Sequence, residues 1–198
     1  MKRSFFSPVP LALLALAGPA ASQSVTFRGK VEDVPGTANQ FVVDCTNTQL
    51  TSASIDLNAF VGQEVLIDGT WNGSTASPAV AVTAISMVPE TFEIGGGASI
   101  GSQARFKTFG TPGDAAAVFA SLGSSFLPFG PAGVGFLDPA TLLNVGVGSV
   151  DGLGVFQVIV PVPNDPALVG LFVLGQGAML GPATPLLLTN PDCKTVQT

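Results

Sequence analysis

Glycine and proline recur along the whole chain and divide it into short apolar segments. The 198 residues include 24 glycines and 16 prolines, and 46% of the residues are hydrophobic. Because both residue types weaken the interior of helices and strands, they mark turns between the segments. No segment combines a helical apolar period with capping residues, whereas many short runs are rich in β-branched side chains. The sequence therefore predicts an all-β fold.

The N-terminus has the features of a secretory signal. Lys2 and Arg3 precede an apolar run at residues 11–17, and small residues then lead to a cleavage site before Gln23. The alternatives are a buried N-terminal helix and an uncleaved anchor, but the run is too short to cross about 30 Å of hydrocarbon. We expect residues 1–22 to be a signal peptide and the mature chain to be secreted, extracellular or at the cell surface.

A first β unit is expected at residues 23–88. Its strands are expected at residues 25–31, 41–45, 53–57, 64–71 and 79–85. Turn residues separate them, among them the dipeptide Asn72-Gly73, which is typical of hairpins. Five short strands with this punctuation predict a small barrel.

Two short motifs in this unit resemble bacterial OB-fold domains of the exported kind. They are Phe27-x-Gly29-x-Val31 and the turn and strand Phe60-Val61-Gly62-Gln63-Glu64-Val65-x-Ile67-x-Gly69. The resemblance implies an OB-like barrel with one face suited to an oligosaccharide or an oligonucleotide. The phenylalanines of the unit are assigned to its core, which departs from an aromatic-lined binding face.

A second β unit is expected after a linker. Pro89 and Gly95-Gly96-Gly97 predict the linker at residues 89–97, and the second unit spans residues 98–198. Its strands are expected at residues 104–109, 115–122, 142–147, 154–162, 168–176 and 185–189. This series of short strands predicts an antiparallel β-sandwich.

The end of the chain resembles an uncharacterised β domain found at the C-termini of secreted proteins of environmental bacteria. The matching residues are Val160-Pro161-Val162-Pro163-Asn164-Asp165-Pro166-Ala167-Leu168-Val169-Gly170-Leu171-Phe172, then Gln176 and Leu187-Leu188-Thr189-Asn190. The resemblance implies secretion and an all-β fold, and it implies no active site. Such domains often carry a Gly-Cys pair in mid-domain, where this chain has Asp151-Gly152-Leu153-Gly154 without a cysteine.

One alternative concerns the apolar stretch at residues 167–189, whose length would suit a transmembrane helix. Pro182, Pro185 and the turn Pro163-Asn164-Asp165-Pro166 favour two strands instead. We therefore expect no membrane span in the mature chain.

The two cysteines, Cys45 and Cys193, are an even pair in an exported chain. Such a pair predicts a disulfide, and an intrachain bond requires the two Cα atoms to lie within about 7 Å. Separate thiols and a bridge between subunits are the alternatives.

The chain contains no histidine, which removes the commonest general base and metal ligand at neutral pH. Ser-His-Asp and Cys-His arrangements are therefore excluded. Glu90 and Glu93 lack the context of a glycosidase pair, and Asn164-Asp165 and Asp151-Gly152 supply too few oxygen ligands for calcium. We predict no catalytic residue, no metal, no cofactor and no enzymatic activity.

The charge balance limits the partners. Thirteen acidic residues against seven basic ones give a formal net charge of −6, which argues against nucleic acid and anionic membranes. Trp71 stands at the end of a predicted strand, where an indole either stacks on a sugar ring or packs at the rim of the core. It is the one residue we single out for ligand binding.

Two functional hypotheses follow from these observations. A mean hydropathy of +0.53 and exposed strand edges favour a secreted structural subunit of a filament, surface layer or matrix that self-associates, through residues 98–130 or 167–189. The alternative is a binding module that holds an oligosaccharide or cell-wall fragment on its OB-like barrel. Exposure of Trp71 beside a groove would favour the second hypothesis.

Overall fold

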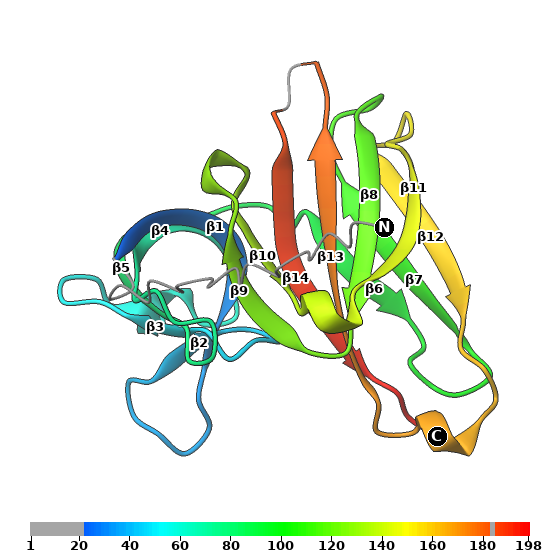
Figure 1. The fold of residues 1–198 in the computed structure, drawn as a ribbon, viewed down its shortest axis with the longest axis horizontal. Coiled ribbons are helices and arrows are strands. Elements are labelled where there is room, and N and C mark those ends of the chain that lie inside the picture. Colours follow the sequence, from blue (N-terminus) through cyan, green and yellow to red (C-terminus); the bar gives the residue numbers. More distant parts are fainter. Residues whose placement is uncertain (1–21, 183–184) are drawn as a thin grey trace, which may run out of the picture.

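The structure is a computed structural model that describes residues 22–182 and 185–198. Its regular elements in these ranges are β-strands and short 3-10 helices, so the all-β prediction is confirmed (Figure 1). The expected signal peptide at residues 1–22 lies outside the described residues, apart from Ser22.

The strands are β1 Gln23–Asp33, β2 Phe41–Val43, β3 Gln49–Thr51, β4 Glu64–Trp71, β5 Ala79–Met87, β6 Phe92–Gly96, β7 Gln103–Phe109, β8 Ala115–Ser121, β9 Ser124–Pro128, β10 Val134–Leu137, β11 Leu143–Ser149, β12 Val155–Pro161, β13 Phe172–Leu180 and β14 Leu187–Thr195. The 3-10 helices are η1 Leu57–Phe60, η2 Gly130–Ala132, η3 Pro139–Thr141 and η4 Pro166–Leu168.

Strands β1 to β5 form the expected barrel, closed in the order β1-β2-β3-β5-β4 (Figure 1). All neighbours are antiparallel except β3 and β5, which are parallel. In β1, Val25, Phe27 and Val31 point into the barrel, as the period of two in a strand with one wet face requires. A Cβ at Gly69 would lie 2.6 Å from Cγ1 of Val80, so glycine permits β4 and β5 to approach closely.

The third strand of the barrel lies earlier than the sequence predicts. It spans 49–51, whereas residues 53–55 form a bend and Leu57 begins η1. Side chains satisfy the local backbone here: Ser52 Oγ accepts from Ile55 N at 3.1 Å, and Asp56 Oδ1 accepts from Asn58 N at 3.0 Å. Such bonds compete with strand pairing, which explains why the prediction of a strand at 53–57 was wrong.

A hairpin of β9 and β10 packs against the barrel and is absent from the strands expected from the sequence (Figure 1). Phe126 and Phe136 are fully buried, and their ring centroids lie 5.8 and 5.5 Å from that of Phe27 in β1. Both residues belong to the same core cluster as the barrel residues. Pro128 and Pro131 gave this segment the pattern of a loop, although its aromatic residues fill the barrel core.

The remaining strands form a four-stranded sheet, β11-β8-β13-β14, and a three-stranded sheet, β12-β7-β6. A second core cluster draws its residues from both sheets. It contains Phe92, Ile94, Phe106, Val118 and Ala120.

Part of the expected linker belongs to this core. Residues 92–96 form β6, which pairs with β7, and the side chains of Phe92 and Ile94 are buried. The prediction of a linker over 89–97 was therefore wrong for these residues. Gly95-Gly96-Gly97 dominated the pattern, while the apolar alternation of Phe92 and Ile94 directs both side chains into the core.

The apolar stretch at residues 167–189 contains the end of η4, β13 and the start of β14 where it is described. In the described ranges, no helix has the length and apolar character that crossing a bilayer requires.

Asn190 on β14 fastens the two sheets together. Its side-chain oxygen accepts from Thr91 N at 2.9 Å and from Phe92 N at 3.0 Å, and its nitrogen donates to the Phe92 carbonyl at 2.8 Å. Its exposed fraction is 1%, so these bonds replace water that the site excludes. Gln176 on β13 makes similar bonds to the backbone of β10.

We predict that Asn190→Leu lowers the free energy of unfolding by about 3 kcal/mol, because it leaves buried backbone groups of Thr91 and Phe92 without partners. Urea denaturation measures the loss. The matched control is Asn164→Leu at an exposed position, which should change stability by less than about 0.5 kcal/mol. Equal stability of the two variants would contradict the assigned role of Asn190.

Candidate functional site

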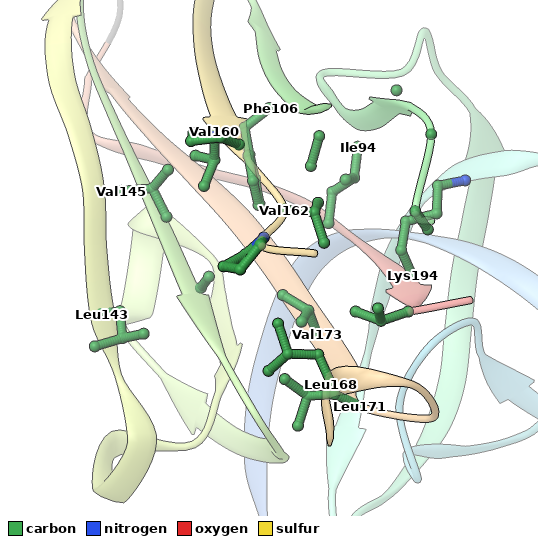
Figure 2. A pocket seen from close by; sticks show the side chains of 18 residues that line it. Ile94, Phe106, Leu143, Val145, Val160, Val162, Leu168, Leu171, Val173 and Lys194 are labelled. Atoms are coloured by element: carbon green, nitrogen blue, oxygen red, sulfur yellow. The ribbon is translucent and has the colours of Figure 1, made fainter. Parts of the chain in front are cut away.

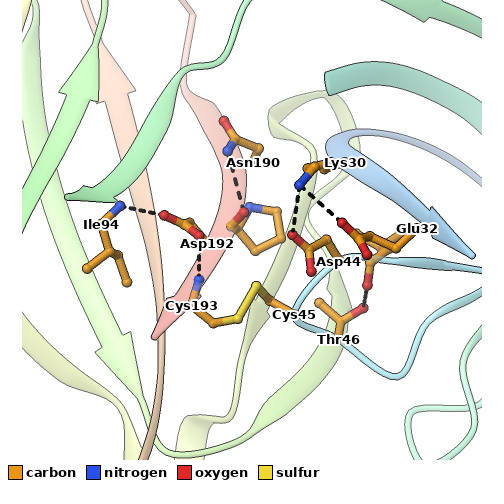
Figure 3. Close-up of a disulfide and its surroundings, with 11 residues drawn as sticks. Lys30, Glu32, Asp44, Cys45, Thr46, Ile94, Asn190, Asp192 and Cys193 are labelled. Atoms are coloured by element: carbon orange, nitrogen blue, oxygen red, sulfur yellow. Dashed lines mark hydrogen bonds and ion pairs between the residues drawn. A yellow bond between two sulfur atoms is a disulfide. The ribbon is translucent and has the colours of Figure 1, made fainter. Parts of the chain in front are cut away.

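A disulfide joins Cys45, which follows β2 in the barrel, to Cys193 on β14 (Figure 3). The Cα atoms lie 5.6 Å apart, so the expected intrachain bond is present. The residues are 148 positions apart in the sequence, and the bond connects the barrel to the four-stranded sheet.

Charged side chains surround this disulfide (Figure 3). Lys30 Nζ lies 3.1 Å from a carboxylate oxygen of Glu32 and 3.7 Å from one of Asp44. Burial raises the pKa of Asp44, and the hydrogen bond with Glu32 raises the pKa of Lys30. Asp44 has the spacing of a metal ligand with Cys45 and Cys193, but the two sulfurs are bonded to each other and supply no thiolate.

Asp192 links β14 to β6 beside the disulfide. Its Oδ1 accepts from Cys193 N at 2.7 Å, and its Oδ2 accepts from Ile94 N at 2.6 Å (Figure 3). Asn190 and Asp192, two residues apart on β14, therefore both hydrogen-bond to the backbone of residues 91–94.

Glu64 is an acid whose pKa lies well above its ordinary value. Burial, reinforced by the negative charge of Glu90, raises its pKa to about 7. Its Oε2 atom is buried and has no hydrogen-bond partner among the described residues. A carboxyl that titrates near neutrality suits a general acid, but the cavities described below are lined by other residues. The effect expected of Glu64 is therefore on stability.

Trp71, the candidate for ligand binding, packs at the rim of the barrel. Its ring centroid lies 5.3 Å from that of Phe126, and its indole nitrogen donates to the Ser74 carbonyl at 3.1 Å. The side chain is half-buried against the barrel core. One ring face and the N–H group are therefore occupied within the protein.

The two sheets have one closed side and one open side. Asn190 and Asp192 close the side at which β6 meets β14. On the other side, away from the barrel, β11 pairs only with β8 and β12 only with β7 among the described strands (Figure 1). The edges of β11 and β12 lie together, since a Cβ at Gly148 would lie 2.5 Å from the ring of Phe156.

This open side is apolar and carries no charge within its strands. Val147 is 69% exposed and Leu143 60% exposed on β11, and Ile159 is 49% exposed on β12. Natural edge strands usually carry lysine, proline or inward charges that prevent pairing with another chain. We call the β11 and β12 edges the open edge. The sequence signal was present in the uncharged run Leu143–Ser149, but sheet order was needed to identify it as an edge.

An apolar cavity of about 230 Å³ opens at the end of the two sheets where β11 begins and β12 ends. Figure 2 shows its walls, and we call it the end cavity. Its lining includes Ile94, Phe106, Val145, Val160, Leu171 and Val173, with Lys194 at the rim. A second apolar hollow lies between the β9–β10 hairpin and the four-stranded sheet, and it includes Phe129 and Leu188. Sequence analysis identified neither, because each is built from several strands.

Comparisons with family models, curated proteins and solved structures find no match to this chain.

We predict that replacing both Cys45 and Cys193 by alanine lowers the free energy of unfolding by up to about 5 kcal/mol, because the bond closes a long loop in the unfolded chain. Urea denaturation measures the loss, and reduced wild-type protein should show the same change. A double variant as stable as the oxidised protein would contradict the contribution assigned to the bond.

We predict that stability falls as the pH rises from about 4.5 to about 7, because folded Glu64 retains a proton that the unfolded chain releases in this range. Glu64→Gln should flatten this dependence and stabilise the protein above pH 7 by about 1 kcal/mol, after allowance for partial solvation. Denaturation curves near pH 5 and pH 8 measure both effects. Glu32→Gln, in the ion pair with Lys30, is the matched control and should retain the pH dependence.

Proposed function

We propose that the protein is a secreted, non-enzymatic structural protein, a subunit of an extracellular filament, surface layer or matrix that assembles through its β domains. The observation that carries the proposal is the open edge, with the edge strands β11 and β12 side by side and apolar residues exposed along them. Unpaired strand edges join other chains through backbone hydrogen bonds.

The contrast between the two sides of the sheets supports this proposal. Asn190 and Asp192 satisfy the backbone of β6 on one side, whereas β11 and β12 have no such cover from the described residues. Neither open strand contains a charged residue, so a second copy meets no like charge there. Burial of Val147 and Leu143 between copies adds about 25 cal/mol per Å² of apolar area.

The simplest arrangement pairs β11 of one copy with β11 of another in an antiparallel manner. A two-fold axis relates the copies, and the four-stranded sheets become continuous across it. Such an interface is closed, so it produces a pair of subunits, and a filament, layer or matrix requires a further contact between pairs.

The other parts of the proposal rest on the fold and the cysteines. The disulfide is typical of an oxidising compartment, which agrees with secretion. The barrel order, with β3 parallel to β5, supports an OB-like barrel, and two sheets around a shared core support a β-sandwich.

The alternative function, an oligosaccharide- or cell-wall-binding module on the OB-like barrel, has less support. It depends on Trp71, whose indole N–H and one ring face are engaged by Ser74 and Phe126. A monomer at high concentration that binds cell-wall oligosaccharides would favour it.

We predict that the mature protein forms dimers or larger assemblies that persist at high salt, because apolar contacts and backbone bonds hold them. Val147→Lys places a charge on the open edge and should weaken pairing at this edge about tenfold or more. Sedimentation velocity measures both. Met87→Lys, at a 67% exposed position on the barrel, is the matched control and should associate like the wild type. A wild-type protein that stays monomeric at high concentration would contradict the proposed function.

A further inference from the structure

The turn between β11 and β12 presents one leucine to solvent. Leu153 is 90% exposed, more than any other large apolar side chain in the described part of the chain. The residues on either side of it are glycines, Gly152 and Gly154, so the side chain stands apart from its neighbours in the chain.

Hydrogen bonds fix this turn. Asp151 Oδ1 accepts from Leu153 N at 2.9 Å and from Val155 N at 3.0 Å. Gly154 N donates to the Asp151 carbonyl at 3.0 Å, and the Gly154 carbonyl accepts from Gly110 N at 3.0 Å. The leucine is therefore held in a defined place, which reduces the entropy lost when a partner covers it.

The end cavity lies at the opposite end of the same strands. Leu153 lies just before β12 begins at Val155, whereas Pro161 at the end of β12 lines the cavity. Seven residues of strand separate the two ends by about 20 Å. Leu153 therefore cannot fill the end cavity of its own chain, but it can meet the cavity of another copy.

The turn that carries Leu153 and the end cavity are complementary in size and in charge. The end cavity holds about 230 Å³, and an apolar cavity of about 150 Å³ already admits a benzene ring, so a leucine side chain fits. Asp151 is exposed two residues before Leu153. Lys194 is exposed at the cavity rim and forms no ion pair within the described residues (Figure 2).

We propose that copies of this protein associate head to tail, with Leu153 of one copy in the end cavity of the next and Asp151 beside Lys194. This inference rests on the proposed self-association and adds a second contact to it. A head-to-tail contact leaves one free turn and one free cavity at the ends of every assembly, so it extends into an open chain. Pairing at the open edge closes after two copies.

Further apolar residues surround both ends and enlarge the contact. At the turn end they are Leu180 and Leu186, and at the cavity end they are Leu143, Val169 and Leu171. Their exposed fractions lie between 36% and 60%. A stable interface buries about 1,600 Å² in total, more than one leucine supplies, and these residues contribute part of the remaining area.

The test uses mature, oxidised protein that carries Val147→Lys, so that pairing at the open edge is blocked. Two variants are made in this background. Leu153→Asp removes the apolar side chain from the turn and leaves the end cavity intact. Ala104→Phe fills the end cavity from β7 and leaves the turn intact. Circular dichroism and the intact disulfide verify folding, and Lys194→Glu at the exposed rim replaces Ala104→Phe if that variant does not fold.

Sedimentation velocity should show chains for the Val147→Lys protein alone and at least a tenfold weaker association for each double variant. An equimolar mixture of the two double variants should form a 1:1 dimer and nothing larger, because only one intact turn and one intact cavity can meet. Met87→Asp in the same background is the control and should form chains.

Two results would overturn the inference. The first is that the wild type assembles and that each double variant assembles as well as the Val147→Lys protein alone. This result leaves the proposed function intact. The second is that the two double variants are each monomeric and remain so when mixed. Failure of the wild type itself to associate would overturn the proposed function together with this inference.

Discussion

The side chain of Asn190 holds the two sheets of this molecule in their relative places. Strand β14 lies between β1 of the barrel, β13 of its own sheet and β6 of the other sheet. Asn190 satisfies backbone groups of Thr91 and Phe92, Asp192 satisfies that of Ile94, and Cys193 bonds covalently to Cys45. One short segment therefore fixes the barrel and both sheets, and a buried amide serves here because it can donate and accept at once.

The sequence predicted what depends on local periodicity and missed what depends on strand order. β4 at Glu64–Trp71 and the barrel were predicted, because alternation in one strand specifies its inner face. The hairpin with Phe126 and Phe136 was missed, since its strands are short and bordered by prolines and glycines. The open edge and the end cavity could not be predicted, because whether Val147 is covered depends on which strand lies beside β11.

The two sides of the sheets differ in charge and in how their backbone groups are satisfied. On the side of β6, Asn190 and Asp192 accept hydrogen bonds from the backbone, and the disulfide holds β14 in place, so this side is closed within one chain. On the side of β11, an uncharged strand has no further strand beside it in the described part of the chain, and no charge protects its edge. In a monomer, this exposed apolar edge would favour aggregation. Its presence is therefore consistent with a partner that covers it, and a second copy of the protein offers a matching strand edge.

The proposed contacts also assign different roles to the two halves of the molecule. The turn with Leu153 and the end cavity lie at opposite ends of β12, so a head-to-tail chain would run along the strands of the two sheets. The barrel lies beside these sheets, on the side away from the open edge (Figure 1). Neither contact uses a barrel residue. The disulfide between the barrel and β14 would hold each barrel at the side of the head-to-tail assembly. The sheets would therefore build the assembly, while the barrel surface stays free along its length.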